Sequence, residues 1–94
     1  MKDIRFVWDP RKDRSNLKKH GIGFEEARTV FYDPRAILYD DPDHSEDEDR
    51  FILLGLSARL NVLVVCHCYR EEEAVIRIIS ARRADKRERE SYRR

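Results

Sequence analysis

Long apolar runs and cysteines are both scarce in this sequence. The longest uninterrupted apolar stretch, residues 62–66, is far too short to cross a bilayer, and the first residues lack the apolar core of a secretory signal peptide. The two cysteines, Cys66 and Cys68, lie too close together on one predicted strand for ordinary disulfide geometry, which favours reduced thiols. We therefore expect a cytoplasmic protein that neither spans a membrane nor is secreted.

Internal repeats and low-complexity linkers are also missing, and 94 residues leave no room for a second core. We expect one domain over residues 1–94. Charged residues make up 41% of the chain, against roughly 25% in an average protein. Because the 40% of residues that are hydrophobic fall in ordered runs, a folded domain with a heavily charged surface is favoured over disorder.

The net charge of +1 conceals a separation of charge along the chain. Residues 1–20 hold seven basic and three acidic side chains, and residues 76–94 hold eight and three, whereas residues 40–49 hold seven acids and no base. Basic surfaces of this kind suit a polyanion, and the acidic loop suits a basic partner. For any single charge, a solvated surface that maintains solubility stays an open alternative.

The order of strand-like and helix-like patterns indicates an α+β fold. Alternating or β-rich runs predict strands at residues 4–8, 36–39, 51–56, 61–69 and 75–80. Capping residues and apolar spacing predict helices at residues 10–20, with Asp9 and Gly21 as caps, between Phe24 and Asp33, and from about Arg83. The order β-α-α-β-β-β-β-α suits an antiparallel sheet with two N-terminal helices and a C-terminal helix, packed on one face.

The last predicted strand carries an arginine among apolar residues. Alternation places Ile76, Ile78 and Ser80 on one face and Arg77 on the other. A buried arginine is costly unless it meets an acid or faces open solvent. Arg77 therefore either forms a salt bridge with a neighbouring strand or grips phosphate from an open sheet face.

Three histidines are candidates for moving protons in metal-free RNA cleavage, where the ribose 2′-OH attacks the adjacent phosphorus and arginines stabilise the developing charge. His20 ends the first helix, where a cation is favoured in any case. His44 lies among acids and is expected to be exposed. His67 alternates with Cys66 and Cys68, which fits a buried, hydrogen-bonded role as well as catalysis.

No metal site or other cofactor is predicted. The segment Cys66-His67-Cys68 has ligand-type side chains, but alternation sends His67 to the face opposite both sulfurs. Residues 40–49 lack the spacing and the glycine of a calcium-binding EF-hand.

The sequence resembles the BrnT family of toxins over nearly its whole length. The similarity rests on short motifs whose order and spacing are together specific: Phe6-Val7-Trp8-Asp9-Pro10, Asn16, Lys19-His20-Gly21-Ile22, Phe24-Glu25-Glu26-Ala27, Val30-Phe31-Tyr32-Asp33-Pro34, His44-Ser45-Glu46, Glu48 with Arg50, Gly55, Arg77-Ile78-Ile79-Ser80-Ala81-Arg82-Arg83-Ala84, Glu88 and Tyr92. Gly23 departs from the family, in which a better capping residue is common, so the second helix is expected to start loosely.

The resemblance implies a RelE-like fold and an endoribonuclease toxin of a type II toxin–antitoxin system that inhibits translation. It also implies neutralisation by a BrnA-type antitoxin with a ribbon-helix-helix part, so that operator DNA is contacted only through the antitoxin. The acidic loop and the C-terminal helix are expected to help dock that antitoxin.

The hypothesis of metal-free RNA cleavage assigns roles to the candidate site residues by their chemistry. Arg77 and Arg82, helped by Arg50, are expected to hold phosphate, and His20 or His67 to move protons. The residues expected to steer the RNA backbone are Lys18, Lys19, Arg83 and Arg87. The alternative is a non-catalytic, toxin-like binding module that acts as a co-repressor with a DNA-binding antitoxin.

Overall fold

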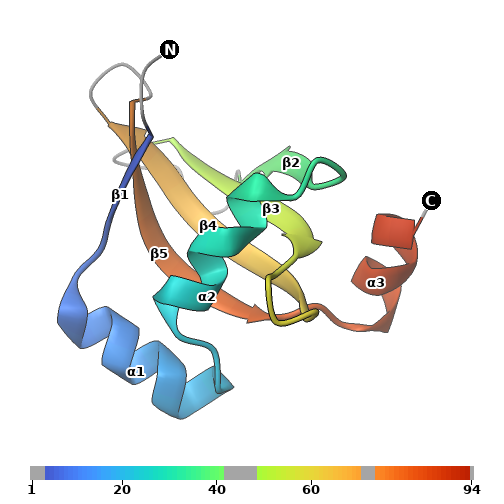
Figure 1. Ribbon diagram of the computed structural model, residues 1–94, viewed down its shortest axis with the longest axis horizontal. Helices are drawn as coiled ribbons and strands as arrows, with labels where there is room; N and C mark the ends of the chain where they lie inside the picture. Colours follow the sequence, from blue (N-terminus) through green and yellow to red (C-terminus); the bar gives the residue numbers. More distant parts are fainter. Residues whose placement is uncertain (1–3, 42–48, 71–73, 94) are drawn as a thin grey trace.

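The computed structural model describes residues 4–41, 49–70 and 74–93. Its elements follow the predicted order (Figure 1): β1 (Arg5–Val7), α1 (Pro10–His20), α2 (Phe24–Thr29), the 3-10 turn η1 (Val30–Tyr32), β2 (Ile37–Asp40), β3 (Arg50–Leu56), β4 (Val62–Arg70), β5 (Val75–Arg83) and α3 (Lys86–Arg93). The α+β prediction is confirmed. His44 and most of the acidic loop lie outside the described residues.

The strands form one sheet in the order β1-β5-β4-β3-β2. Strands β2 to β5 are antiparallel neighbours, as predicted, but β1 runs parallel to β5, with Phe6 beside Ile76. Parallel neighbours need a long crossover connection between them. Here the chain from α1 through β4 forms that connection between β1 and β5.

Local signals account for the start and end of α1. The Asp9 side chain accepts a hydrogen bond from the backbone N–H of Arg11 at 2.8 Å, and Pro10 occupies the first turn. Gly21 takes the left-handed conformation (φ 73°) and donates to the Leu17 carbonyl at 2.8 Å. Both predicted caps are confirmed.

The first backbone N–H of α2 has its hydrogen-bond acceptor outside the helix. Gly23 offers no side-chain cap, but the Asp13 carboxylate of α1 accepts a hydrogen bond from the Phe24 N–H at 2.8 Å. The expectation of a loosely started helix is therefore wrong, because a residue eleven positions earlier supplies the acceptor.

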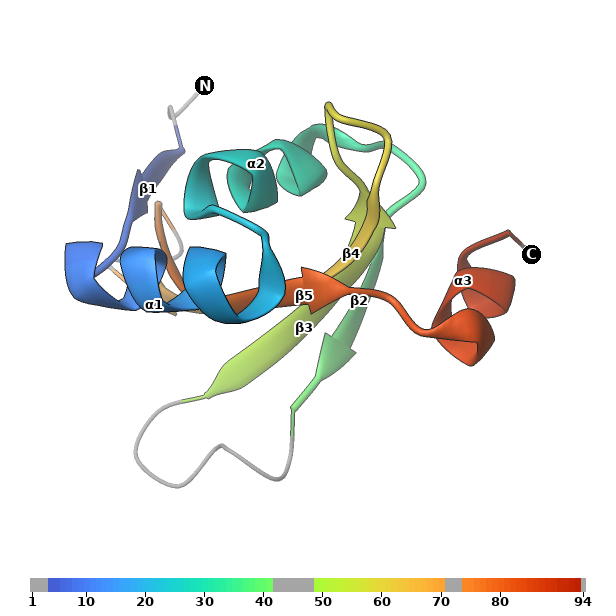
Figure 2. The same cartoon turned by 90° about the horizontal axis from the view of Figure 1, so that it is seen from below.

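The main core lies between the sheet and the pair α1 and α2. Its buried residues are Ile22, Phe24, Ala27, Val30, Leu53, Leu63, Val65, Ile78 and Ala81. Figure 2 shows α3 well apart from α1 and α2. A smaller cluster of Leu54, Val64 and Ala84 receives Tyr92 of α3. Since Leu54 and Val64 alternate with core residues along their strands, α3 contacts the opposite sheet face. The prediction that all the helices pack on one face is therefore wrong.

A register shift between β4 and β5 decides which residues reach that opposite face. Cys66 pairs with Ser80 and His67 pairs with Ile78, so Ile79 is an extra residue of β5 that has no paired residue in β4. Such a bulge reverses the alternation of side chains after it. Ile78 and Ala81 thus both lie in the core, and the expectation that Ser80 shares a face with Ile78 is wrong.

Helix α3 begins at Lys86, three residues later than predicted, because β5 continues to Arg83. Asp85 and Glu88 form a capping box: the Glu88 N–H donates to Asp85 Oδ1, and the Asp85 N–H donates to Glu88 Oε1, both at 2.8 Å. The Tyr92 hydroxyl donates to Asp33 Oδ2 at 2.7 Å. Contacts within the chain therefore account for this helix without a partner.

Across the described part of the chain, we find no helix with the length and apolar character needed to span a membrane.

Candidate functional site

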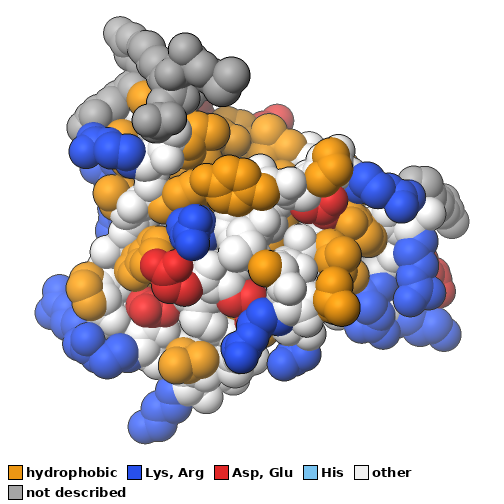
Figure 3. Space-filling view, viewed as in Figure 1, with side chains coloured by type: hydrophobic (Ala, Val, Ile, Leu, Met, Phe, Trp, Pro, Cys, Tyr) orange, Lys and Arg blue, Asp and Glu red, His pale blue; other side chains and the backbone are white. Residues whose placement is uncertain are grey.

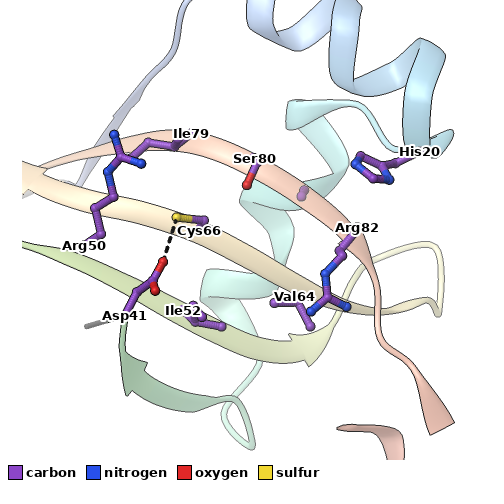
Figure 4. A pocket seen from close by; sticks show the side chains of 10 residues that line it. His20, Asp41, Arg50, Ile52, Val64, Cys66, Ile79, Ser80 and Arg82 are labelled. Atoms are coloured by element: carbon purple, nitrogen blue, oxygen red, sulfur yellow. Dashed lines mark hydrogen bonds between the residues drawn. The ribbon is translucent and has the colours of Figure 1, made fainter. Parts of the chain in front are cut away.

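The sheet face away from α1 and α2 carries a pocket of about 360 Å³. The residues that line it come from the end of α1, the segment after β2, and strands β3 to β5: His20, Asp41, Arg50, Ile52, Val64, Cys66, Ile79, Ser80, Ala81 and Arg82. Three predicted catalytic residues, His20, Arg50 and Arg82, therefore line one pocket. Figure 4 shows His20 and Arg82 towards one end of it and Arg50 towards the other.

Strand register explains this spacing of the two arginines. Arg82 pairs with Val64 and Arg50 pairs with Cys68, on either side of β4. Four residues of an extended strand correspond to roughly 13 Å. The two cationic side chains thus start from opposite ends of the pocket, with Cys66 and Ser80 between them.

Arg82 forms a two-pronged ion pair with Glu88 of α3. Its two terminal nitrogens donate to the two carboxylate oxygens at 2.8 and 2.9 Å. The hydrogen bond with Glu88 raises the pKa of Arg82, and the same bond lowers the pKa of Glu88. A guanidinium in this orientation fits two oxygens of a carboxylate or of a phosphate equally well.

Cys66 and Asp41 meet within the pocket, at 3.8 Å between Sγ and Oδ2. Burial, and then the negative charge of Asp41, raise the pKa of the Cys66 thiol to about 11. Cys66 is therefore a neutral thiol at physiological pH, which suits it to weak hydrogen bonding and not to nucleophilic attack. Sequence reasoning missed Asp41 and Ser80 as lining residues, and the alternation of Cys66 with His67 was the one local signal for this face.

Arg77 lies outside this pocket. It lines a separate hollow with Val7, Trp8, Asp9 and Arg70. No carboxylate among the described residues forms an ion pair with Arg77, so the salt-bridge interpretation finds no support in that part of the chain.

His67 lies on the core face and is completely buried. Its Nδ1 is 3.1 Å from the Val65 carbonyl oxygen, its Nε2 is 3.3 Å from the Tyr69 hydroxyl, and its ring meets the edge of Phe31. Burial lowers the pKa of His67, which disfavours its charged form. These surroundings fit the buried, hydrogen-bonded alternative.

The predicted steering residues lie on the elements that flank the pocket. Lys18 and Lys19 are exposed in the last turn of α1, and Arg87 is exposed on α3. Arg83 follows Arg82 and donates to Asn61 Oδ1 at 3.0 Å. Figure 3 shows Lys and Arg side chains gathered over α1 and over α3. Within residues 4–41, 49–70 and 74–93, no three His, Cys, Asp or Glu side chains are placed to hold a metal ion.

Fold and site together define a small α+β domain with a cationic pocket on its open sheet face. Residues 8–88 match the family described as the ribonuclease toxin, BrnT, of type II toxin–antitoxin systems. The chain therefore belongs to the BrnT family of ribonuclease toxins, and membership implies an RNA substrate and an antitoxin partner.

The fold is also similar to a solved structure. The crystal structure of the Brucella abortus ribonuclease toxin, BrnT, superimposes with a TM-score of 0.68 at 22% sequence identity, covering 88% of this chain and 99% of that one. At this identity the similarity concerns the fold. No curated protein matches the sequence.

Proposed function

We propose that this protein is an endoribonuclease that cuts RNA without a metal ion, and that the pocket lined by His20, Arg50 and Arg82 is its active site. The observation that carries the proposal is the convergence of these three side chains, from α1, β3 and β5, on one pocket of the open sheet face. In a chain of the BrnT family, a histidine and two arginines that share a pocket can supply one proton-transfer group and two phosphate-binding groups.

The pocket suits attack by the ribose 2′-OH on the adjacent phosphorus. His20 takes the 2′-OH proton as the new 2′-O–P bond forms. The bond from phosphorus to the 5′-oxygen breaks, and the leaving oxygen takes a proton from the imidazolium or from water. Arg82 and Arg50 stabilise the negative charge that builds on the phosphoryl oxygens. The products are a 2′,3′-cyclic phosphate and a 5′-hydroxyl end.

The spacing of the arginines suits an extended polyanion. Side chains that start roughly 13 Å apart along a strand can contact successive parts of an RNA backbone. In this arrangement Arg82 binds the phosphate that reacts, close to His20, and Arg50 binds a neighbouring one. We assign Arg77, in its separate hollow, a binding contribution, and His67 a role in the core.

Steering and neutralisation complete the proposal. Lys18, Lys19, Arg83 and Arg87 attract the RNA backbone, and cleavage stops translation in the cytoplasm. A BrnA-type antitoxin neutralises the enzyme and alone contacts operator DNA. Membership of a type II toxin family supports an RNA substrate and an antitoxin partner, and the exposure of these four basic side chains beside the pocket supports the steering.

One observation favours the non-catalytic alternative. Both terminal nitrogens of Arg82 already donate to the Glu88 carboxylate. In a non-catalytic binding module, Arg82 could stay in this ion pair because it would not take part in chemistry. RNA cleavage by the purified chain separates the two functions.

The test is incubation of the purified protein with a mixed-sequence RNA in EDTA, followed by analysis of the product ends. We expect cleavage at an unchanged rate in EDTA, with cyclic-phosphate ends. Activity that disappears with the chelator and returns with a divalent ion would overturn the metal-free mechanism. Complete absence of cleavage, with RNA binding retained, would favour the binding module.

A further inference from the structure

Asn16 is the one buried residue of α1, and its side-chain amide makes three hydrogen bonds. The nitrogen donates to the Ala81 carbonyl at 2.7 Å and to the Ile22 carbonyl at 2.8 Å. The oxygen accepts from the Ala81 N–H at 3.2 Å. Asparagine has only modest helix propensity, so this position is explained by its contacts and not by the helix.

The two bonds to Ala81 replace a missing strand. Strand β1 accompanies β5 only as far as Arg77, because the chain then turns into α1. Beyond that point, this edge of β5 has backbone groups that need partners. The Asn16 amide takes both the N–H and the C=O of Ala81, as a residue of a neighbouring strand would do.

These bonds join the two parts of the polypeptide that carry the proposed chemistry. Ala81 lies between Ser80 and Arg82, and all three line the pocket. His20 follows Asn16 by four residues, which places both on the same side of α1. Ile22 comes directly after Gly21, which ends α1. Asn16 is therefore bonded to the strand beside Arg82 and to the chain just after His20.

We propose that Asn16 is the positioning residue of the active site: its amide fixes the end of α1 against β5, so that His20 stays in line with the phosphate held by Arg82. This inference rests on the proposed function. Asn16 itself does not line the pocket and acts through His20.

A purely structural role for Asn16 makes different predictions. If the amide only stabilises the fold, its loss lowers the melting temperature and the fraction of active protein, while the folded molecules keep their turnover rate. If it positions His20, the folded molecules themselves become slow although they still bind RNA. A displacement of about 1 Å at a reacting group can cost roughly 100-fold in rate.

The variants are Asn16→Asp, which keeps the shape and loses both donors, and Asn16→Ala. Thr29→Val is the matched control, because the Thr29 hydroxyl also bonds across the fold, accepting from the Ala58 N–H at 2.8 Å, and neither residue lines the pocket. All are assayed below their own melting temperatures. We expect kcat to fall about 100-fold in both Asn16 variants with KM for RNA within about twofold of the parent, and Thr29→Val to keep the parent kcat.

A second readout does not depend on cleavage. Inorganic phosphate is titrated at low ionic strength while NMR signals of the His20 ring and the Arg82 side chain are followed. In the parent both signals should change with one dissociation constant. In the Asn16 variants, the Arg82 signal should keep that constant and the His20 signal should stop following it.

The outcomes separate this inference from the proposed function. A parent that cuts no RNA overturns the function, and the phosphate titration still decides the role of Asn16. The positioning role is overturned if kcat falls only with the folded fraction, if His20 still follows phosphate in the variants, if neither residue responds in the parent, or if no Asn16 variant folds.

Discussion

The guanidinium of Arg82 and the carboxylate of Glu88 are joined by two parallel hydrogen bonds beside the pocket, at 2.8 and 2.9 Å. Both side chains are partly exposed, at 45% and 28%, so the pair is screened by water and can open. A phosphate has the same charge sign as the carboxylate and can also accept two parallel hydrogen bonds from a guanidinium. If Arg82 binds the RNA phosphate, as we propose, Glu88 competes with RNA for Arg82.

Replacing Glu88 with glutamine tests this competition. Gln at this position still serves the capping box of α3, so the change removes mainly the charge. Exposed ion pairs contribute about 0.2–1 kcal/mol, so RNA should bind roughly 1.5- to fivefold more tightly in a filter-binding assay. Glu90→Gln, which removes an exposed charge on the same helix, should change the dissociation constant less. Weaker binding by Glu88→Gln would mean that Glu88 orients Arg82 instead.

The two lysines in the last turn of α1 should act through salt-dependent binding. Each phosphate contact to a single strand contributes about 0.7 to the slope of log K against log salt concentration. Lys18→Gln combined with Lys19→Gln should therefore reduce that slope by about 1.4. Arg11→Gln with Lys12→Gln, at the other end of α1, is the control. An unchanged slope in the first pair removes these lysines from the RNA path.

His67 should make stability depend on pH. Burial lowers its pKa below the usual 6.5, so the unfolded chain binds a proton at a higher pH than the folded one. Stability is thus complete above about pH 6.5 and declines as the pH falls towards the lowered pKa. Urea unfolding at pH 7.5 and 5.5 should show the loss in the parent and in His20→Asn. His67→Phe should show a smaller one, and equal losses in all three would exclude His67 as the cause.

Gly55 should be the glycine that tolerates alanine least. A Cβ there would lie 2.8 Å from Val30 Cγ1 and 2.9 Å from Ala36 Cβ, so η1 would have to move from β3. Overpacking of this kind costs about 1–3 kcal/mol, which we expect as a lower melting temperature by calorimetry. At Gly23 the nearest contacts would be 3.7 and 3.9 Å, so Gly23→Ala should change the melting temperature little. A similar effect at both positions contradicts the close packing.

Local sequence patterns predicted most of the helices and strands, because the interactions that start and end these elements join residues only a few positions apart. Asp9 and Gly21 cap α1 by bonds to Arg11 and Leu17, and residues 57–61 form the short link between β3 and β4, whose strands were predicted at 51–56 and 61–69. The parallel placement of β1 was not predictable, because it depends on how the whole chain closes.

The site was predictable in its residue types but not in its grouping. The sequence predicted His20, Arg50 and Arg82 as site residues, whereas their meeting in one pocket without Arg77 and His67 depends on the sheet. The extra residue at Ile79 reverses the alternation after it, which brings Ser80 and Arg82 to the pocket face, and no local signal in the sequence marks it. The contacts of Asn16 with Ala81 and of Arg82 with Glu88 likewise exist only after folding.

Single-turnover cleavage of RNA by parent, His20→Ala and Arg82→Ala proteins, each confirmed as folded, tests most directly that this pocket is the active site. Arg59→Ala, an exposed arginine of the turn between β3 and β4, is the matched control. We predict that each pocket variant loses about 100-fold or more in rate and that Arg59→Ala keeps the parent rate. Parent-like rates in both pocket variants would contradict the account.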